Sequence, residues 1–132
     1  MKIPYLINIQ KVNSNIGNLS IFEMQKHIQF EAKRIFVLND VNSEIIRGNH
    51  AHKETEQFML CLQGEINFFA EMPNGEKYYF KLNDSSVGLY IPPNAWHYME
   101  YKKNSIQIVC ASHHYDENDY LRTKNEFKNY YL

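Results

Sequence analysis

Two histidines and a carboxylate lie close together in residues 47–64, which read RGNHAHKETEQFMLCLQG. Side chains alternate between the faces of a β-strand, so His50 and His52 are expected to point the same way. An imidazole has an ordinary pKa of about 6.5, which lets it accept and return a proton at neutral pH. It is also a common metal ligand, and Glu56 follows four residues after His52. The stretch therefore predicts either a proton-transfer site or most of a metal site.

A third histidine closes a second informative stretch, residues 88–97, which reads GLYIPPNAWH. Its glycine and its proline pair indicate a strand and a sharp turn, and His97 follows that turn. The two stretches in this order resemble the paired signature of cupins, which are small jelly-roll β-barrels. The resemblance implies that His50, His52, Glu56 and His97 converge inside the mouth of the barrel. Such a set suits Fe, Mn, Ni or Zn, and metal-free acid–base chemistry by the same histidines is the competing interpretation.

The composition favours one folded domain spanning residues 1–132. A hydrophobic fraction of 44% argues against disorder, and a net charge of −1 gives no electrostatic footprint for nucleic acid. Cys61 and Cys110 both stand in apolar runs and are interpreted as small core residues. The sequence shows neither a signal-peptide pattern nor an apolar run long enough to span a membrane. We therefore expect a cytoplasmic protein without membrane or nucleic-acid partners.

Short β-rich segments separated by turn residues predict an all-β barrel or sandwich. Residues 19–24, LSIFEM, are expected to form one of these strands. Residues 116–130 are expected to form a C-terminal helix, because Asp116, Glu117 and Asp119 suit a helix N-terminus. Glu117, Asp119 and Arg122 are expected to brace this helix on the barrel. The predicted fold is thus a cupin-like jelly-roll barrel with a short C-terminal helix.

Further motifs extend the resemblance over most of the chain. They read RGNHAHK, EQ, GLYIPPNAWH and ASHHYDENDYLR, with Phe127 beyond. In these motifs the chain is similar to the TDP-4-keto-6-deoxyglucose 3,4-ketoisomerases, cupin-fold enzymes of deoxysugar biosynthesis. The resemblance implies a homodimer without a cofactor or metal, acting on a TDP-linked 4-keto-6-deoxy sugar. It also implies a downstream aminotransferase and a product destined for surface glycans such as lipopolysaccharide.

The resemblance also suggests roles for individual residues. Moving a ketone from C4 to C3 needs a proton removed at C3, an enediolate, and a proton returned at C4. His50 is then the expected base, with His52 as its partner. The remaining candidates are assigned to substrate binding: Arg47 and Lys53 beside the histidines for the pyrophosphate, Trp96 for stacking or for filling the barrel, and Arg34 as a phosphate ligand or a surface residue.

Three positions depart from the pattern of this family. Phe36 stands where a tyrosine that could move a proton between two oxygens is often found. Ile16 replaces an arginine or a polar residue before Gly17, and Asn49 replaces an aromatic residue. These departures leave open the proton carrier between the oxygens and the configuration of the product at C4.

Three other functions fit the same scaffold. A 3,5-epimerase-like enzyme would remove protons beside a ketone that stays at C4. A metal-dependent cupin, such as a dioxygenase, would use the histidines as ligands. A non-catalytic sugar-binding module would bind TDP without turnover.

Overall fold

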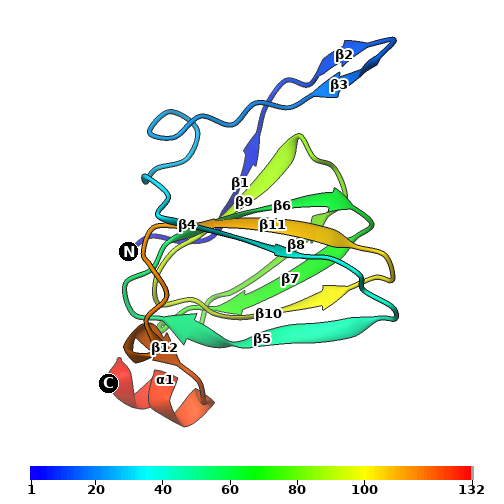
Figure 1. Ribbon diagram of the computed structural model, residues 1–132. Coiled ribbons are helices and arrows are strands. Elements are labelled where there is room, and N and C mark those ends of the chain that lie inside the picture. Colours follow the sequence, from blue (N-terminus) through cyan, green and yellow to red (C-terminus); the bar gives the residue numbers. More distant parts are fainter. Residues whose placement is uncertain (132) are drawn as a thin grey trace.

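Two five-stranded antiparallel sheets stack on each other in the computed structural model, which describes residues 1–131 (Figure 1). The upper sheet has the order β1 (Tyr5–Asn8), β9 (Val87–Ile91), β6 (Gln57–Gln63), β11 (Ile106–Ala111) and β4 (Arg34–Leu38). The lower sheet has the order β12 (Tyr120–Leu121), β5 (Ile45–His52), β10 (Trp96–Tyr101), β7 (Ile66–Glu71) and β8 (Lys77–Leu82). Strands far apart in sequence thus become neighbours, which is the arrangement of a jelly roll and confirms the all-β prediction.

The core lies between the two sheets. Strand β7 alternates strictly, so Ile66, Phe68 and Ala70 are buried while the residues between them are partly exposed. They belong to the same cluster as Met59 and Leu89 of the upper sheet. Fully burying one large apolar side chain contributes about 1.5–3 kcal/mol. Both sheets therefore depend on one core, as the prediction of a single domain requires.

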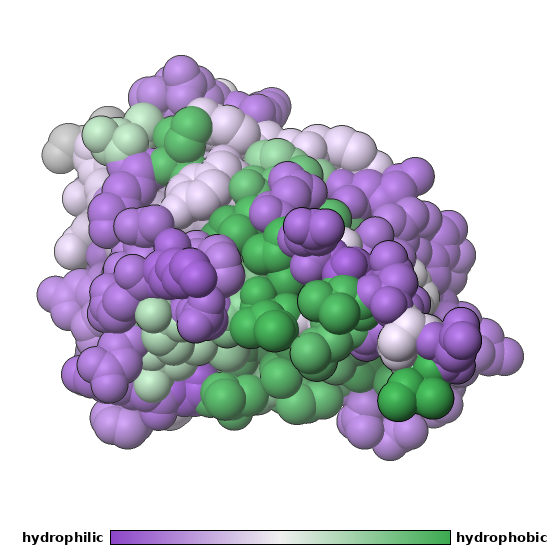
Figure 2. Space-filling model, turned by 90° about the horizontal axis from the view of Figure 1, so that it is seen from above, coloured by the Kyte–Doolittle hydropathy of each residue, from purple (hydrophilic) through white to green (hydrophobic). Residues whose placement is uncertain are grey.

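The outer face of the upper sheet is only partly covered. In the segment between β3 and β4, Ile28 and Phe30 pack with Phe58 and Tyr90 of the sheet. Farther along the face, apolar side chains remain exposed on β4 and β6, namely Ile35 (62%), Val37 (56%) and Leu62 (49%). Figure 2 shows a hydrophobic area in the middle of this upper face, bordered by polar residues.

A separate hairpin, β2 (Val12–Ser14) and β3 (Gly17–Leu19), stands away from both sheets (Figure 1). The predicted strand at residues 19–24 is wrong, because β3 ends at Leu19 and only a single bridge joins Met24 to Ile28. Residues 26–28 instead return their amides to the carbonyl oxygen of Glu23, which forms a tight turn. Local turn bonding therefore outweighs the β-propensity of this stretch.

The C-terminal helix is real but shorter than predicted. Asp116 caps one 3₁₀ turn at Glu117–Asp119, and β12 then pairs with β5. Helix α1 (Lys124–Tyr130) begins after Thr123, which forms a capping box with Glu126. The predicted start at residue 116 was wrong because the acidic residues there serve a turn before a strand. No helix among residues 1–131 is both long and apolar enough to cross a membrane.

Candidate active site

A cavity of about 320 Å³ opens between the sheets and is lined by three of the expected functional residues. This volume lies within the range of small-molecule sites, about 300–1000 Å³. Its walls come from both sheets and from β12. The residues that line it include Phe36, Arg47, His50, His97, Tyr101, Gln107, Tyr120 and Arg122.

A backbone irregularity in β5 sets the position of His50. Gly48 and Asn49 have φ values of 103° and 58°, and the pairing register of β10 shifts between His97 and Tyr98. A Cβ at Gly48 would lie 3.0 Å from the His97 carbonyl oxygen, so only glycine permits this approach of the two strands. Asparagine tolerates positive φ better than an aromatic side chain, which explains Asn49. The result places His50 directly across from His97.

His50 is partly exposed to the cavity and is surrounded by aromatic rings. Its ring centroid lies 5.0 Å from that of His52 and 4.8 Å from that of His97. Burial lowers the pKa of His50 to about 4, and the neighbouring His52 adds to this effect. His50 is therefore neutral at pH 7 and can accept a proton from a bound molecule.

His52 is held by a carboxylate behind it. Its Nδ1–H donates to Oδ2 of Asp119 at 2.9 Å, which leaves the Nε2 lone pair free. Burial lowers the pKa of His52, and the bond to Asp119 partly offsets this. Asp119 also accepts from the Thr55 hydroxyl at 2.5 Å and the Glu54 amide at 2.7 Å. Burial opposes the ionised form of Asp119, but these hydrogen bonds lower its pKa, so it stays a carboxylate.

His97 forms the back of the histidine group. It is 2% exposed, and its Nδ1–H donates to the Ala95 carbonyl oxygen at 2.9 Å. Burial holds its pKa well below 6.5, with the nearby His50 as the second cause. Its ring also stacks on Phe68 at 5.5 Å between centroids. His97 therefore supplies a fixed, neutral wall beside His50.

Glu56 does not join the histidines, so its expected place in their group is wrong. Its carboxylate accepts hydrogen bonds from Lys2 at 2.8 Å and from the Tyr90 hydroxyl at 2.5 Å. It thereby ties the N-terminal segment to the upper sheet, and the carboxylate that contacts the histidines is that of Asp119. Among residues 1–131, no group of three or more His, Cys, Asp or Glu residues is arranged to hold a metal ion.

Tyr120 and Arg122 line the cavity, although sequence reasoning had not placed them in the site. Tyr120 pairs with His52 across β12 and β5, and its ring centroid lies 4.4 Å from that of His52. The Arg122 guanidinium lies 4.1 Å from the centre of the Tyr120 ring. Arg122 also donates to both carboxylate oxygens of Glu117, at 2.7 and 2.8 Å. The DYLR motif was visible in the sequence, but only the pairing of β12 with β5 brings it to the histidines.

The four predicted binding residues separate in space. Arg47 lines the cavity. Lys53 lies outside it, with Nζ 5.4 Å from the centre of the Tyr130 ring. Trp96 also lies outside, at 8% exposure, with its ring packed against Phe127 of α1, so it neither fills the barrel nor faces the cavity.

Arg34 occupies an intermediate position. Its guanidinium lies 5.6 Å from the ring of Phe36, which lines the cavity, and 5.8 Å from that of Tyr115. Its Nε is buried and has no hydrogen-bond partner among residues 1–131. Arg34 is thus beside the cavity with an unused donor.

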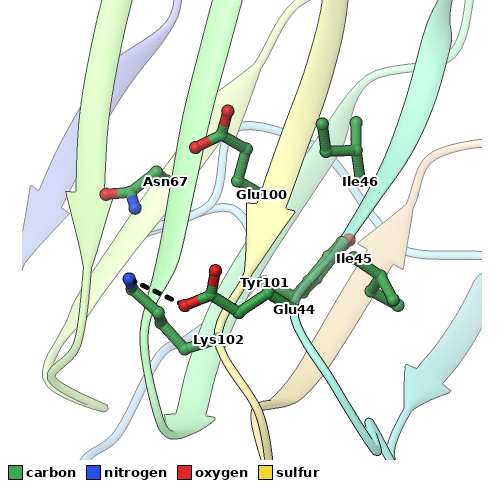
Figure 3. A pocket seen from close by; sticks show the side chains of 7 residues that line it. All are labelled: Glu44, Ile45, Ile46, Asn67, Glu100, Tyr101 and Lys102. Carbon is green, nitrogen blue, oxygen red and sulfur yellow. Dashed lines mark hydrogen bonds and ion pairs between the residues drawn. The ribbon is translucent and has the colours of Figure 1, made fainter.

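A second hollow, of about 490 Å³, has a different character (Figure 3). It lies over β5, β10 and β7 of the lower sheet and contains none of the histidines. Its charged groups Glu44 and Lys102 pair with each other at 3.0 Å. This hollow therefore lacks the histidines that line the cavity between the sheets.

Comparison with known proteins agrees with this geometry. Residues 2–131 match the family described as FdtA: WxcM-like, C-terminal. A relative from Aneurinibacillus thermoaerophilus, named TDP-4-oxo-6-deoxy-alpha-D-glucose-3,4-oxoisomerase, is 36% identical over 95% of this chain and 90% of its own.

Solved structures give the same result. QdtA, a sugar 3,4-ketoisomerase from Thermoanaerobacterium thermosaccharolyticum in complex with TDP, is 34% identical, with a TM-score of 0.89 over 96% of this chain and 93% of that one. A 3,4-ketoisomerase from Helicobacter canadensis is 32% identical, with a TM-score of 0.90 over 97% and 96%. These matches confirm the predicted resemblance and the cupin-like fold.

A more distant relative shares the fold alone. The dTDP-4-dehydrorhamnose 3,5-epimerase of Bacillus anthracis is 14% identical, with a TM-score of 0.79 over 89% of this chain and 76% of that one. The scaffold is therefore common to both chemistries, and the side chains in the cavity must decide between them.

Proposed function

We propose a function from the premise that this chain belongs to the FdtA family: it is an isomerase that converts TDP-4-keto-6-deoxy-D-glucose to a TDP-3-keto-6-deoxyhexose. The observation that carries this proposal is a neutral histidine, His50, at the wall of the cavity between the sheets. The relatives named above supply the substrate class. Proton NMR of TDP-4-keto-6-deoxyglucose with the purified protein tests the proposal, which requires that a 3-keto sugar forms.

The reaction needs one base that reaches two adjacent carbons. His50 removes the proton from C3 of the sugar, which gives an enediolate, and returns a proton to C4. Its low pKa keeps it unprotonated before the reaction. His52, held by Asp119, packs edge-on against the His50 ring at 5.0 Å between centroids and thereby helps to fix its orientation.

Cationic groups at the cavity stabilise negative charge. Arg47 and Arg122 both line it and are permanently protonated. One guanidinium near the enediolate lowers the energy of that intermediate. The other is suited to bind the pyrophosphate of the TDP group. Arg34, whose Nε has no hydrogen-bond partner among residues 1–131, is a further phosphate ligand at the edge. Lys53 and Trp96 lie outside the cavity, and their contacts with the substrate rest on the sequence resemblance alone.

Arg47→Ala is expected to weaken binding of the TDP-sugar by about 1–3 kcal/mol, the scale of a lost charge-assisted hydrogen bond. Isothermal titration calorimetry with TDP measures this directly. Lys103→Ala serves as the matched control, because it removes an exposed cation from the β10–β11 turn, outside the cavity. Unchanged affinity in Arg47→Ala would assign Arg47 to the structure of β5 instead.

The active form is a homodimer in this proposal, with a second copy of the chain covering the apolar upper face. The β2–β3 hairpin stands free in one chain, and its exposed apolar residues include Ile16 (100%) and Leu19 (56%). The upper sheet carries an apolar area as well (Figure 2), to which the exposed Ile35, Val37 and Leu62 belong. Exposed apolar areas of this kind mark association surfaces.

Sedimentation velocity is expected to show a dimer for the unchanged protein. The double variant Ile16→Asp, Leu19→Asp is expected to sediment as a monomer, because charges would be buried at the interface. Ile46→Asp is the control, since Ile46 at 60% is about as exposed as Leu19 at 56% but lies on the lower sheet. A monomeric unchanged protein at micromolar concentration would rule out this assembly.

The wider context follows from the product. A 3-keto sugar is the substrate that an aminotransferase requires to make a 3-amino-3,6-dideoxyhexose. We place the enzyme before such an aminotransferase, in the cytoplasm, in the synthesis of surface glycans such as lipopolysaccharide.

A further inference from the structure

We propose that Tyr120 is a catalytic residue, whose phenol carries a proton between O3 and O4 of the substrate. This inference rests on the proposed ketoisomerase function and deepens it. The proton on O3 must reach O4 for the ketone to move, and His50 is occupied with the proton from carbon. A second proton carrier beside the histidines is therefore required by the reaction.

The pairing of β12 with β5 places Tyr120 beside the histidines at the cavity. The register of β12 on β5 sets Tyr120 opposite His52, so that its ring lies 4.4 Å from His52 and 5.2 Å from His50 between centroids. The ring lines the same cavity as His50. None of the side-chain hydrogen bonds among residues 1–131 uses its hydroxyl, so that group is available to a ligand.

The other groups that line the cavity are less suited to this task. Tyr101 is 3% exposed, and its hydroxyl donates to Gln107 at 2.8 Å. Phe36 has no proton to give. His97 is 2% exposed, and its Nδ1–H is bonded to a backbone carbonyl oxygen. Arginine does not give up its proton in proteins, which excludes Arg47 and Arg122.

Arg122 makes Tyr120 more effective as a carrier. Its guanidinium lies 4.1 Å from the ring centre, and Glu117 holds it there by two hydrogen bonds. A cation over the ring fixes the orientation of the ring. The same positive charge stabilises the negative charge that develops on the phenol oxygen during transfer. The motif from Glu117 to Arg122 is thus part of the site.

The transfer balances without a further reactant. His50 takes the C3 proton, and the electron pair forms the C3–C4 double bond while O4 becomes negative. The phenol O–H bond breaks as Tyr120 gives its proton to O4, and the phenolate takes the proton from O3. The O3 electron pair then forms the new C3 carbonyl, and C4 takes its proton from His50.

Tyr120→Phe separates the two proton transfers. In deuterated water the variant is expected to lose about 10²–10⁴-fold in formation of the 3-keto sugar, the usual contribution of one acid–base group. It is also expected to keep exchange of the C3 hydrogen, because His50 still removes that proton. Proton NMR follows both events in one sample. Tyr79→Phe is the matched control, because its hydroxyl bonds Asn67 on the outer face, away from the cavity.

Two outcomes would overturn the assignment. Turnover of Tyr120→Phe within threefold of the unchanged enzyme would remove its hydroxyl from the reaction. Loss of C3 exchange together with turnover, at unchanged TDP affinity, would make the phenol a positioning group for His50. If the unchanged enzyme forms no 3-keto sugar, the proposed ketoisomerase function is wrong. If the unchanged enzyme forms it and one of the two outcomes above is found for Tyr120→Phe, only the role of Tyr120 is wrong.

A second variant keeps the test decisive if Tyr120→Phe does not fold. 3-Fluorotyrosine at position 120 retains the ring and the hydroxyl but makes the phenol more acidic. The alkaline limb of the pH–rate profile is expected to move to lower pH. An unchanged profile would overturn the role of Tyr120.

Discussion

His50→Asn is expected to reduce kcat for 3-keto sugar formation by about 10²–10⁴-fold while the affinity for TDP stays unchanged. The asparagine side chain resembles the atoms of the imidazole ring nearest to Cβ in size and polarity. Its amide cannot accept a proton from carbon. The ring lines the cavity, and its pKa of about 4 keeps it neutral at pH 7. Removal of this side chain therefore removes the base and leaves the cationic groups of the cavity in place.

Two separate measurements on His50→Asn distinguish an effect on the chemical step from an effect on binding. Turnover is measured with TDP-4-keto-6-deoxyglucose, and TDP affinity is measured by calorimetry. His114→Asn is the matched control, because His114 is exposed and lies outside the cavity. Turnover by His50→Asn at the level of the control would transfer the base role to another group, with His52 the first candidate.

Asp119→Asn is expected to lower kcat by about 10²-fold with little change in TDP affinity. The Asp119 carboxylate accepts the Nδ1 proton of His52 and two further hydrogen bonds, from Thr55 and the Glu54 amide. An amide can offer a donor to His52, which favours the other tautomer. His52 then carries its proton on Nε2, which is buried and has no hydrogen-bond partner among residues 1–131, and this disturbs the packing of the ring against His50.

The measurement must distinguish a change in the tautomer and orientation of the His52 ring from a loss of folded structure. Nitrogen-15 NMR of histidine reports the His52 tautomer, which is expected to change in Asp119→Asn and stay in Asp116→Asn. Asp116 is a suitable control because it caps the adjacent 3₁₀ turn. An unchanged tautomer and unchanged kcat in Asp119→Asn would leave Asp119 with a structural role only.

The local patterns predicted the strands that carry the site. Alternation and turn residues predicted an all-β fold, and the resemblance of the two histidine motifs to those of cupins implied that His50 and His97 converge. The same patterns failed at the strand expected for residues 19–24 and at the start of the C-terminal helix. In both places short-range hydrogen bonds, around Glu23 and at the Thr123 capping box, decided the structure.

The rest of the site could not be read from the sequence because it depends on long-range pairing. Asp119 lies 67 residues after His52, and only the β12–β5 pair brings the two together. The acidic run at residues 116–119 looked like a helix start, so Asp119 was assigned to bracing. Conversely, Glu56 is close to the histidines in sequence, but the turn after β5 directs it to Tyr90.

The central claim is that His50 moves a proton from C3 to C4 and shifts the ketone. Proton NMR of TDP-4-keto-6-deoxyglucose with the purified enzyme in deuterated water, with a metal chelator present, tests it most directly. We expect a 3-keto sugar, and the same reaction in ordinary water gives the coupling of the C4 proton, which reports the configuration there. Hydrogen exchange at C3 and C5 with the ketone still at C4, or an unchanged spectrum, would contradict the account.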